Sequence, residues 1–187
     1  MTKVKKKYAG LSRKELLEKA YELGFNYERC SRSCSQCTAA ALHELLHIDD
    51  IVVKVANSSC GGQATQVQGT CGALIGGTMV LDYFFGRSVK DMSTQEAITD
   101  NIKLNRAGVA IAKQLYDKFM AKYRSILCPQ IHAQLYGRMY YLPEPEEREK
   151  FDAAGGHSDP EKSCCAVVGD SARWVAEILF NQNTIEL

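Results

Sequence analysis

Eight cysteines in 187 residues are the side chains of this sequence best able to do chemistry. Two of them lie in the stretch Cys60–Gly77, CGGQATQVQGTCGALIGG, where a loop of glycine and small polar residues runs into the apolar segment ALIGGTMVLDYFF. That segment is long enough for a helix, so Cys71 is predicted to stand at a helix start. A helix N-terminus carries a partial positive charge, which favours the thiolate form of a cysteine. The sequence therefore indicates a working cysteine at this position.

Other predicted helix starts also carry cysteine. Cys37 comes near the start of an alanine- and leucine-rich helix, Cys128 precedes a proline at the first helical position, and a Cys-Cys pair opens the last helix. If these starts converge in the fold, their thiols share one site; the alternative is a set of scattered cysteines without mutual contacts. The candidate cofactor ligands are Cys37, Cys71, Cys128, Cys164 and Cys165, of which Cys37, Cys71, Cys128 and Cys164 form the predicted metal set.

Several kinds of chemistry are open to such thiols. Four thiolates bind an iron–sulfur cluster, or zinc where the geometry is tetrahedral. Thiols in pairs instead carry out thiol–disulfide exchange, and the candidate catalytic pairs are Cys34 with Cys37 and Cys60 with Cys71. We favour the cluster, because four separate helix starts supply more ligands than a dithiol needs. The expected function is electron transfer or small-substrate reduction, with a metal-free dithiol oxidoreductase or a structural zinc domain as alternatives.

Two further motifs fit less well. The spacing Cys30-x3-Cys34-x2-Cys37 is that of radical-SAM enzymes, which carry it on a (β/α) barrel, whereas this chain is too short and shows no strand–helix alternation. Thr38 follows the CxxC where a c-type haem site needs histidine. The segment His43–His47, HELLH, matches the zincin pattern, but we locate neither a third ligand nor an edge strand for substrate.

Start and stop signals predict helices along the whole chain. Ser12–Glu15 is a capping box that opens a helix to about Leu23, with Gly24 as its stop. Ser93–Glu96 is a second capping box, before what we expect to be the longest helix, to about Tyr123. No stretch shows convincing strand alternation.

These signals predict an all-α fold. We expect one bundle-like domain of six to seven helices over residues 11–187, with a glycine-rich cysteine loop. Residues 1–10 are predicted to form a basic flexible tail. Residues 139–162, rich in Pro, Glu, Gly and Asp, are predicted to form a surface insertion.

The composition limits the classes of partner that the protein is expected to bind. The net charge of +1 gives no broad field for nucleic acid or an acidic membrane surface, and no apolar stretch reaches transmembrane length. No apolar segment follows the basic start, so we see no secretory signal and expect a cytoplasmic protein. Thiols stay reduced in that compartment, which makes stapling disulfides rare. The expected partner is a redox protein or a small-molecule substrate.

The stretch Cys71–Gly76, CGALIG, matches the CGAxxG motif of the C_GCAxxG_C_C family of redox-active proteins. A CGG-containing loop precedes the motif and cysteines follow it in the family's order, so the chain resembles this family from about Cys30 to Phe180. The resemblance implies that the four family cysteines carry over as Cys37, Cys71, Cys128 and one of Cys164 and Cys165.

The same family is similar to the non-haem part of split-Soret cytochromes, which are α-helical, dimeric and associated with an iron–sulfur centre. The resemblance therefore implies a cluster and a homodimer, while the haem half does not carry over because this chain has no CxxCH. The chain departs from the family pattern in its extra cysteines, Cys30, Cys34, Cys60 and one of the Cys-Cys pair, and in a longer insertion around residues 142–162.

Overall fold

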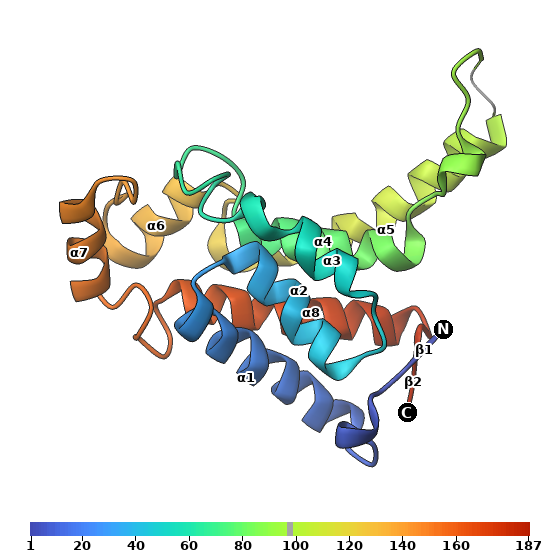
Figure 1. The fold of residues 1–187 in the computed structure, drawn as a ribbon, viewed down its shortest axis with the longest axis horizontal. Coiled ribbons are helices and arrows are strands. Elements are labelled where there is room, and N and C mark those ends of the chain that lie inside the picture. The colour runs from blue at the N-terminus through green and yellow to red at the C-terminus, as the bar shows by residue number, and fades with distance from the viewer. Residues whose placement is uncertain (97–98) are drawn as a thin grey trace.

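The computed structural model describes residues 1–96 and 99–187, and nearly all the regular secondary structure in this part of the chain is helical (Figure 1). Its eight α-helices are α1 (Arg13–Ser31), α2 (Cys34–Leu45), α3 (Asp50–Val55), α4 (Gly72–Phe85), α5 (Thr99–Tyr123), α6 (Cys128–Tyr136), α7 (Pro145–Ala153) and α8 (Cys164–Asn181). The predicted all-α fold is confirmed. The helix count exceeds six to seven because short α3 is a helix of its own, started by Asp49, whose Oδ1 accepts a hydrogen bond from the Ile51 N–H at 2.9 Å.

The core is built around α8, which packs against α1, α2, α4 and α5. In Figure 1, α1 and α8 run side by side, and α6 and α7 lie together at one end of the molecule. The side chains of α8 are buried along nearly its whole length. A helix that is apolar around most of its circumference has to be central, so the remaining helices are arranged by their contacts with it.

The first helix begins where the sequence predicts and ends later. Ser12 and Glu15 form the capping box, in which the Ser12 N–H donates to the Glu15 carboxylate at 2.8 Å. The expected stop at Gly24 is wrong, because α1 continues to Ser31. A Cβ at Gly24 would lie 2.9 Å from the Val168 carbonyl oxygen, so this glycine serves the close crossing of α1 and α8.

The N-terminal residues differ from the expected flexible tail. Strand β1 (Thr2–Lys3) pairs in parallel with β2 (Ile185–Glu186), and this pair is the only sheet in the described residues. Tyr8 is buried, and its hydroxyl donates to Glu44 at 3.0 Å. Pairing with the C-terminal strand and burial of an aromatic ring hold the basic segment against the domain.

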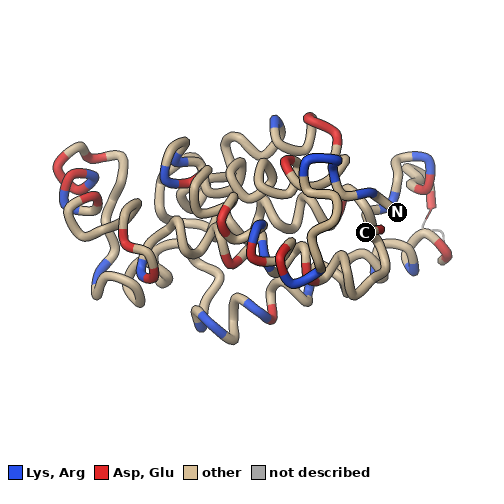
Figure 2. The backbone as a smooth tube through the Cα atoms, turned by 90° about the horizontal axis from the view of Figure 1, so that it is seen from below, with Lys and Arg blue, Asp and Glu red and all other residues tan. Residues whose placement is uncertain are grey.

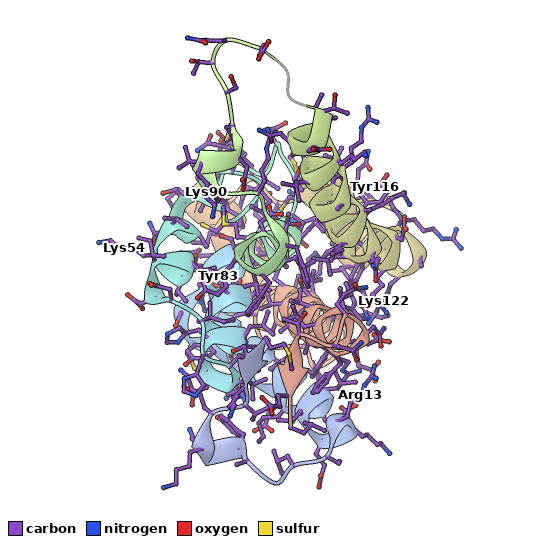
Figure 3. The ribbon with its side chains drawn as sticks, turned by 90° about the vertical axis from the view of Figure 1, so that its right-hand side faces the viewer. Arg13, Lys54, Tyr83, Lys90, Tyr116 and Lys122 are labelled. Carbon is purple, nitrogen blue, oxygen red and sulfur yellow. The ribbon has the colours of Figure 1, made fainter. Side chains whose placement is uncertain are left out.

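The longest helix is α5, and only its described part can be compared with the prediction. Ser93 Oγ accepts hydrogen bonds from the Gln95 and Glu96 N–H groups at 3.2 and 3.5 Å, but residues 94–96 form a bend and not the first helical turn that the predicted capping box requires. The predicted first apolar residue of this helix, Ile98, lies outside the described residues. Tyr116 is exposed on the outer side of α5, at the end of the molecule viewed in Figure 3.

Along the described backbone, the positions of basic and acidic residues are both spread over most of the molecule (Figure 2). No helix in residues 1–96 or 99–187 combines the length and the apolar character needed to cross a bilayer.

One prediction concerns the crossing of α2 and α4. A Cβ at Gly76 would lie 2.1 Å from the Ser35 carbonyl oxygen, a backbone atom that cannot swing away. We expect Gly76→Ala to lower the free energy of unfolding by at least about 3 kcal/mol, because overpacking forces the two helices apart. Urea unfolding measures this loss. Ala107→Ser, which adds one heavy atom at an exposed position of α5, should leave the midpoint unchanged; equal effects of both variants would contradict the proposed crossing.

Candidate functional site

Four helix starts converge on one cavity, and each of them carries a cysteine. Cys34, Cys128 and Cys164 are the first residues of α2, α6 and α8, and Cys71 is the residue directly before α4. All four line a cavity of about 410 Å³, together with Cys60 from the glycine loop. Of the cysteines expected to converge, Cys71, Cys128 and Cys164 meet at this cavity, and Cys34 occupies the place predicted for Cys37.

A short backbone bridge brings Cys71 and Cys128 together. The Cys71 N–H donates to the Ile126 carbonyl at 2.7 Å, and the Cys128 N–H donates to the Gly69 carbonyl at 2.9 Å. These bonds flank an isolated antiparallel bridge between Thr70 and Leu127. The segments just before α4 and α6 are thus locked side by side, which fixes both thiols at the cavity.

The glycine loop is shaped to approach Cys34 closely. Gly61 donates its N–H to the Cys34 sulfur at 3.3 Å, and a Cβ at Gly72 would lie only 2.4 Å from that sulfur. Residues 61–65 all have left-handed φ angles, between 48° and 73°, although three of them are not glycine. Backbone in this region costs of order 1 kcal/mol or more per non-glycine residue and is typical of functional sites.

A buried histidine lies between two of the sulfurs. His132 Nε2 is 3.9 Å from the Cys128 sulfur and 3.8 Å from the Cys164 sulfur. The ring is 1% exposed and stacks on Phe151 with a centroid distance of 5.0 Å and an interplanar angle of 13°. Burial lowers the pKa of His132 to about 4, so the imidazole is neutral and can either accept from a thiol or donate to a thiolate.

Burial favours the thiol form of the cysteines at the cavity. It raises the pKa of Cys71 to about 11, against the opposing effect of the Ala73 and Leu74 N–H groups at the start of α4. It also raises the pKa values of Cys34, Cys128 and Cys164 above the ordinary range. The expected preference for thiolate at a helix start is therefore outweighed, because the thiols are removed from water as well as placed at the dipole.

Two predicted ligands lie outside this cavity. Cys37, one turn into α2, is buried in the hydrophobic core, and burial raises its pKa. The Cys165 thiol donates to the His157 carbonyl at 3.4 Å, and burial raises the pKa of this thiol to about 12. Cys30 is exposed on α1. All eight cysteines are free, so the pairs Cys34–Cys37 and Cys60–Cys71 are not bonded; the roles of the individual cysteines stay predictions.

The segment 139–162, which we predicted to be a surface insertion, is exposed over much of its length and also forms a wall of the cavity. Phe151 of α7 is fully buried, and Arg148 and His157 line the cavity beside it. The composition of the segment suggested that it is exposed to solvent. Its one phenylalanine, however, packs against His132 and Tyr136 of α6 and anchors the segment there.

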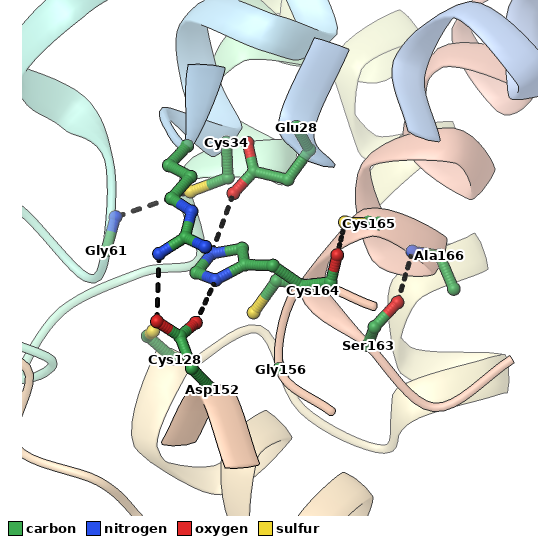
Figure 4. Close-up of polar contacts among 12 residues, drawn as sticks. Glu28, Cys34, Gly61, Cys128, Asp152, Gly156, Ser163, Cys164, Cys165 and Ala166 are labelled. Atoms are coloured by element: carbon green, nitrogen blue, oxygen red, sulfur yellow. Dashed lines mark hydrogen bonds and ion pairs between the residues drawn. The ribbon is translucent and has the colours of Figure 1, made fainter. Parts of the chain in front are cut away.

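A series of linked polar side chains crosses this wall of the cavity, and none of these side chains was predicted from the sequence. Arg32 Nη1 donates to Asp152 Oδ2 at 2.9 Å, His157 Nδ1 lies 2.9 Å from Asp152 Oδ1, and His157 Nε2 lies 3.8 Å from Glu28 Oε1 (Figure 4). Glu28 is 3% exposed, and burial raises the pKa of its carboxyl to about 7. No sequence signal marks Glu28, since the predicted helix stopped before it.

The zincin-like segment does not form a metal site. Helix α2 ends at Leu45, so His43 lies on the helix and His47 lies beyond it, whereas that motif needs both on one helical face. Within residues 1–96 and 99–187, no three Cys, His, Asp or Glu side chains are gathered closely enough to hold a single metal ion. The thiols instead line a cavity that is larger than the space around a single metal ion.

Comparison with known proteins agrees with the sequence resemblance. The family described as "Putative redox-active protein (C_GCAxxG_C_C)" matches residues 32–178, a span that includes every cavity cysteine and leaves out Glu28. No curated protein and no solved structure matches the chain.

Proposed function

Because the chain belongs to the C_GCAxxG_C_C family of redox-active proteins, we propose that its cysteine-lined cavity binds an iron–sulfur cluster, used for electron transfer or for reduction of a small substrate. The observation that carries the proposal is the meeting of four helix-start cysteines at one buried cavity. Iron–sulfur clusters are held by cysteine thiolates, and helix N-termini favour the negative charge of such a centre.

The residues at the cavity fit a cluster better than a single ion. Five thiols surround about 410 Å³, which is room for several metal and sulfur atoms, whereas zinc needs its ligands around one point. We propose Cys34, Cys71, Cys128 and Cys164 as the ligands, with Cys60 as a fifth thiol beside them. Cys34 replaces Cys37 in this set because Cys34 lines the cavity.

When bound, the cluster would supply one-electron chemistry. The chain's own residues would surround the site and keep water out: Val167 and Ile131 line the cavity as apolar groups. His132 lies within reach of two sulfurs and can donate a hydrogen bond to a thiolate, an interaction that tunes reduction potential. Because burial favours the thiol form of these cysteines, binding of a cluster would release protons to solvent.

The second candidate is a metal-free dithiol oxidoreductase, and one observation favours it. The sulfurs of Cys128 and Cys164 flank the same imidazole nitrogen, which can take the proton from an attacking thiol. The pair would then cycle between two thiols and one disulfide. This pair differs from the pairs predicted from sequence. A cytoplasmic location, a redox partner and a homodimer stay predictions.

Anaerobic purification followed by iron and sulfide analysis and a visible spectrum tests the proposal. We expect a brown protein whose iron and sulfide are present in matching amounts. A colourless preparation with no iron, also after reconstitution with ferrous iron and sulfide, would overturn it. Thiol titration of that preparation before and after mild reduction then addresses the second candidate, which requires a reversible gain of two thiols per active pair.

A further inference from the structure

We propose that Glu28 is a proton donor in the cavity and that His157, positioned by Asp152, supplies its protons, so that the reaction at this site is a reduction that takes up protons. The inference rests on the proposed function, in which the cavity holds a redox centre, and goes beyond it by choosing substrate reduction over simple electron transfer. It names the substrate class: a small molecule that gains both electrons and hydrogen.

The position of Glu28 carries the first step. The residue lies on α1, its carboxyl lines the same cavity as the cysteine sulfurs, and it is 3% exposed. Its Oε2 is buried without a hydrogen-bond partner among the described residues. An unpartnered buried carboxyl oxygen is costly, so its place at a cavity wall indicates a group that it meets there. Burial raises the pKa of Glu28 to about 7, although contacts of the carboxyl with the Cys37 thiol and the Ser33 N–H oppose this rise, and the shift keeps a proton available near neutral pH.

The second step is the connection to solvent. Asp152, His157 and Glu28 form a series that leads inward from the surface. The exposed fraction of their side chains falls from 36% for Asp152 to 13% for His157 and 4% for Glu28. His157 Nδ1 lies 2.9 Å from Asp152, and its Nε2 faces Glu28 at 3.8 Å. The second distance is long for a hydrogen bond, as such contacts often are before substrate binds. In Figure 4, a series of dashed contacts leads from Asp152 of α7 to Glu28 of α1.

The charges around the series suit proton transfer. Partial burial raises the pKa of Asp152, but hydrogen bonds from His157 and Arg32 outweigh it and lower that pKa, so the group is a carboxylate. Burial and the nearby Arg32 charge lower the pKa of His157, while the Asp152 carboxylate at Nδ1 opposes them, so the imidazolium that forms on proton uptake gives up its proton readily. His157 then returns to neutral by passing the Nε2 proton to Glu28. Asp152 is a positioning residue in this scheme, because it acts through His157.

Hydroxylamine is a suitable probe, because its reduction balances only with protons: its N–O bond breaks, two electrons and two protons enter, and ammonia and water form. Glu28 gives a proton to the departing oxygen or to nitrogen, becomes a carboxylate and is reprotonated by His157. Dithionite supplies the electrons through the redox centre. Ferricyanide is the matched probe, since it takes an electron and no proton from the reduced protein.

The experiment compares both probes in the intact protein and three variants. We expect Glu28→Gln to slow hydroxylamine reduction about a hundredfold, the scale of a lost general acid, and to leave oxidation by ferricyanide unchanged. Asp152→Asn, at the exposed end of the series, should slow hydroxylamine reduction less and also spare ferricyanide. Glu22→Gln, the same change at an exposed position of α1, should affect neither. Iron content and the visible spectrum show that each variant keeps its centre.

The outcomes separate this inference from the proposed function. Glu28→Gln slowing both probes equally, or neither, overturns the inference, as does an intact protein that reacts with ferricyanide and never with hydroxylamine. A preparation without iron or colour that reacts with neither probe removes the proposed function, and this inference with it.

Discussion

Replacing Cys128 by serine is expected to remove most of the bound iron and sulfide and the visible absorption of the protein. Cys128 is 5% exposed and lies with its sulfur 3.9 Å from His132 Nε2. Serine fills nearly the same space but offers a hard hydroxyl in place of a soft thiolate, which is the ligand that iron–sulfur clusters select. The chain should still fold, because the Cys128 N–H keeps its bond to the Gly69 carbonyl. Iron, sulfide and spectrum are measured after anaerobic reconstitution.

The matched controls are serine variants at cysteines outside the cavity. Cys30→Ser, at an exposed position of α1, should retain the iron content of the unmodified protein. Cys37→Ser should retain most of the iron, whereas Cys34→Ser should lose it, because of these two cysteines only Cys34 lines the cavity. Loss on changing Cys37 with retention on changing Cys34 would contradict the ligand set proposed from the structure and support the set predicted from the sequence.

The sequence predicted the cysteines best where local signals fix a helix start. Pro129 marks the start of α6, and the apolar run after Cys71 marks α4, so Cys71 and Cys128 lie where expected. The start of α2 has a weaker signal. The Ser33 side chain makes no capping hydrogen bond, and the helix begins at Cys34, one turn before the expected start. That single turn separates the thiol at the cavity from the thiol in the core.

The acidic and basic groups of the site could not be predicted, because nothing local determines them. Glu28 reads as an ordinary helical glutamate, and it is buried only because α1 runs past Gly24 and meets the segment after α7. The same holds for His157, which follows two glycines in a stretch of solvent-like composition. Long-range packing places both groups, and a single sequence carries no direct signal for such contacts.

Shortening Phe151 to alanine is the second change with a large expected effect. Its ring is fully buried and lies 5.0 Å from the rings of His132 and His157 and 5.3 Å from Tyr136, measured between centroids. A Cβ at Gly156 would lie 2.4 Å from the ring, so the chain returning from α7 packs directly against the outer end of the ring. We expect Phe151→Ala to lower the free energy of unfolding by about 3–5 kcal/mol, the usual loss for a buried phenylalanine. Urea unfolding measures it.

The effect of Phe151→Ala should be concentrated in the wall of the cavity. Segment 139–162 is short of other buried apolar anchors, so losing the ring frees α7 while the core around α8 keeps its packing. Limited proteolysis should then cut within 139–162 before any other site, and Phe151→Leu should restore most of the resistance. A variant that unfolds as a whole, with no early cleavage there, would show that the wall and the core are one cooperative unit. Selective cleavage with an intact core would instead mean that the cavity can open without unfolding the protein, which gives substrate or iron a route to the buried thiols.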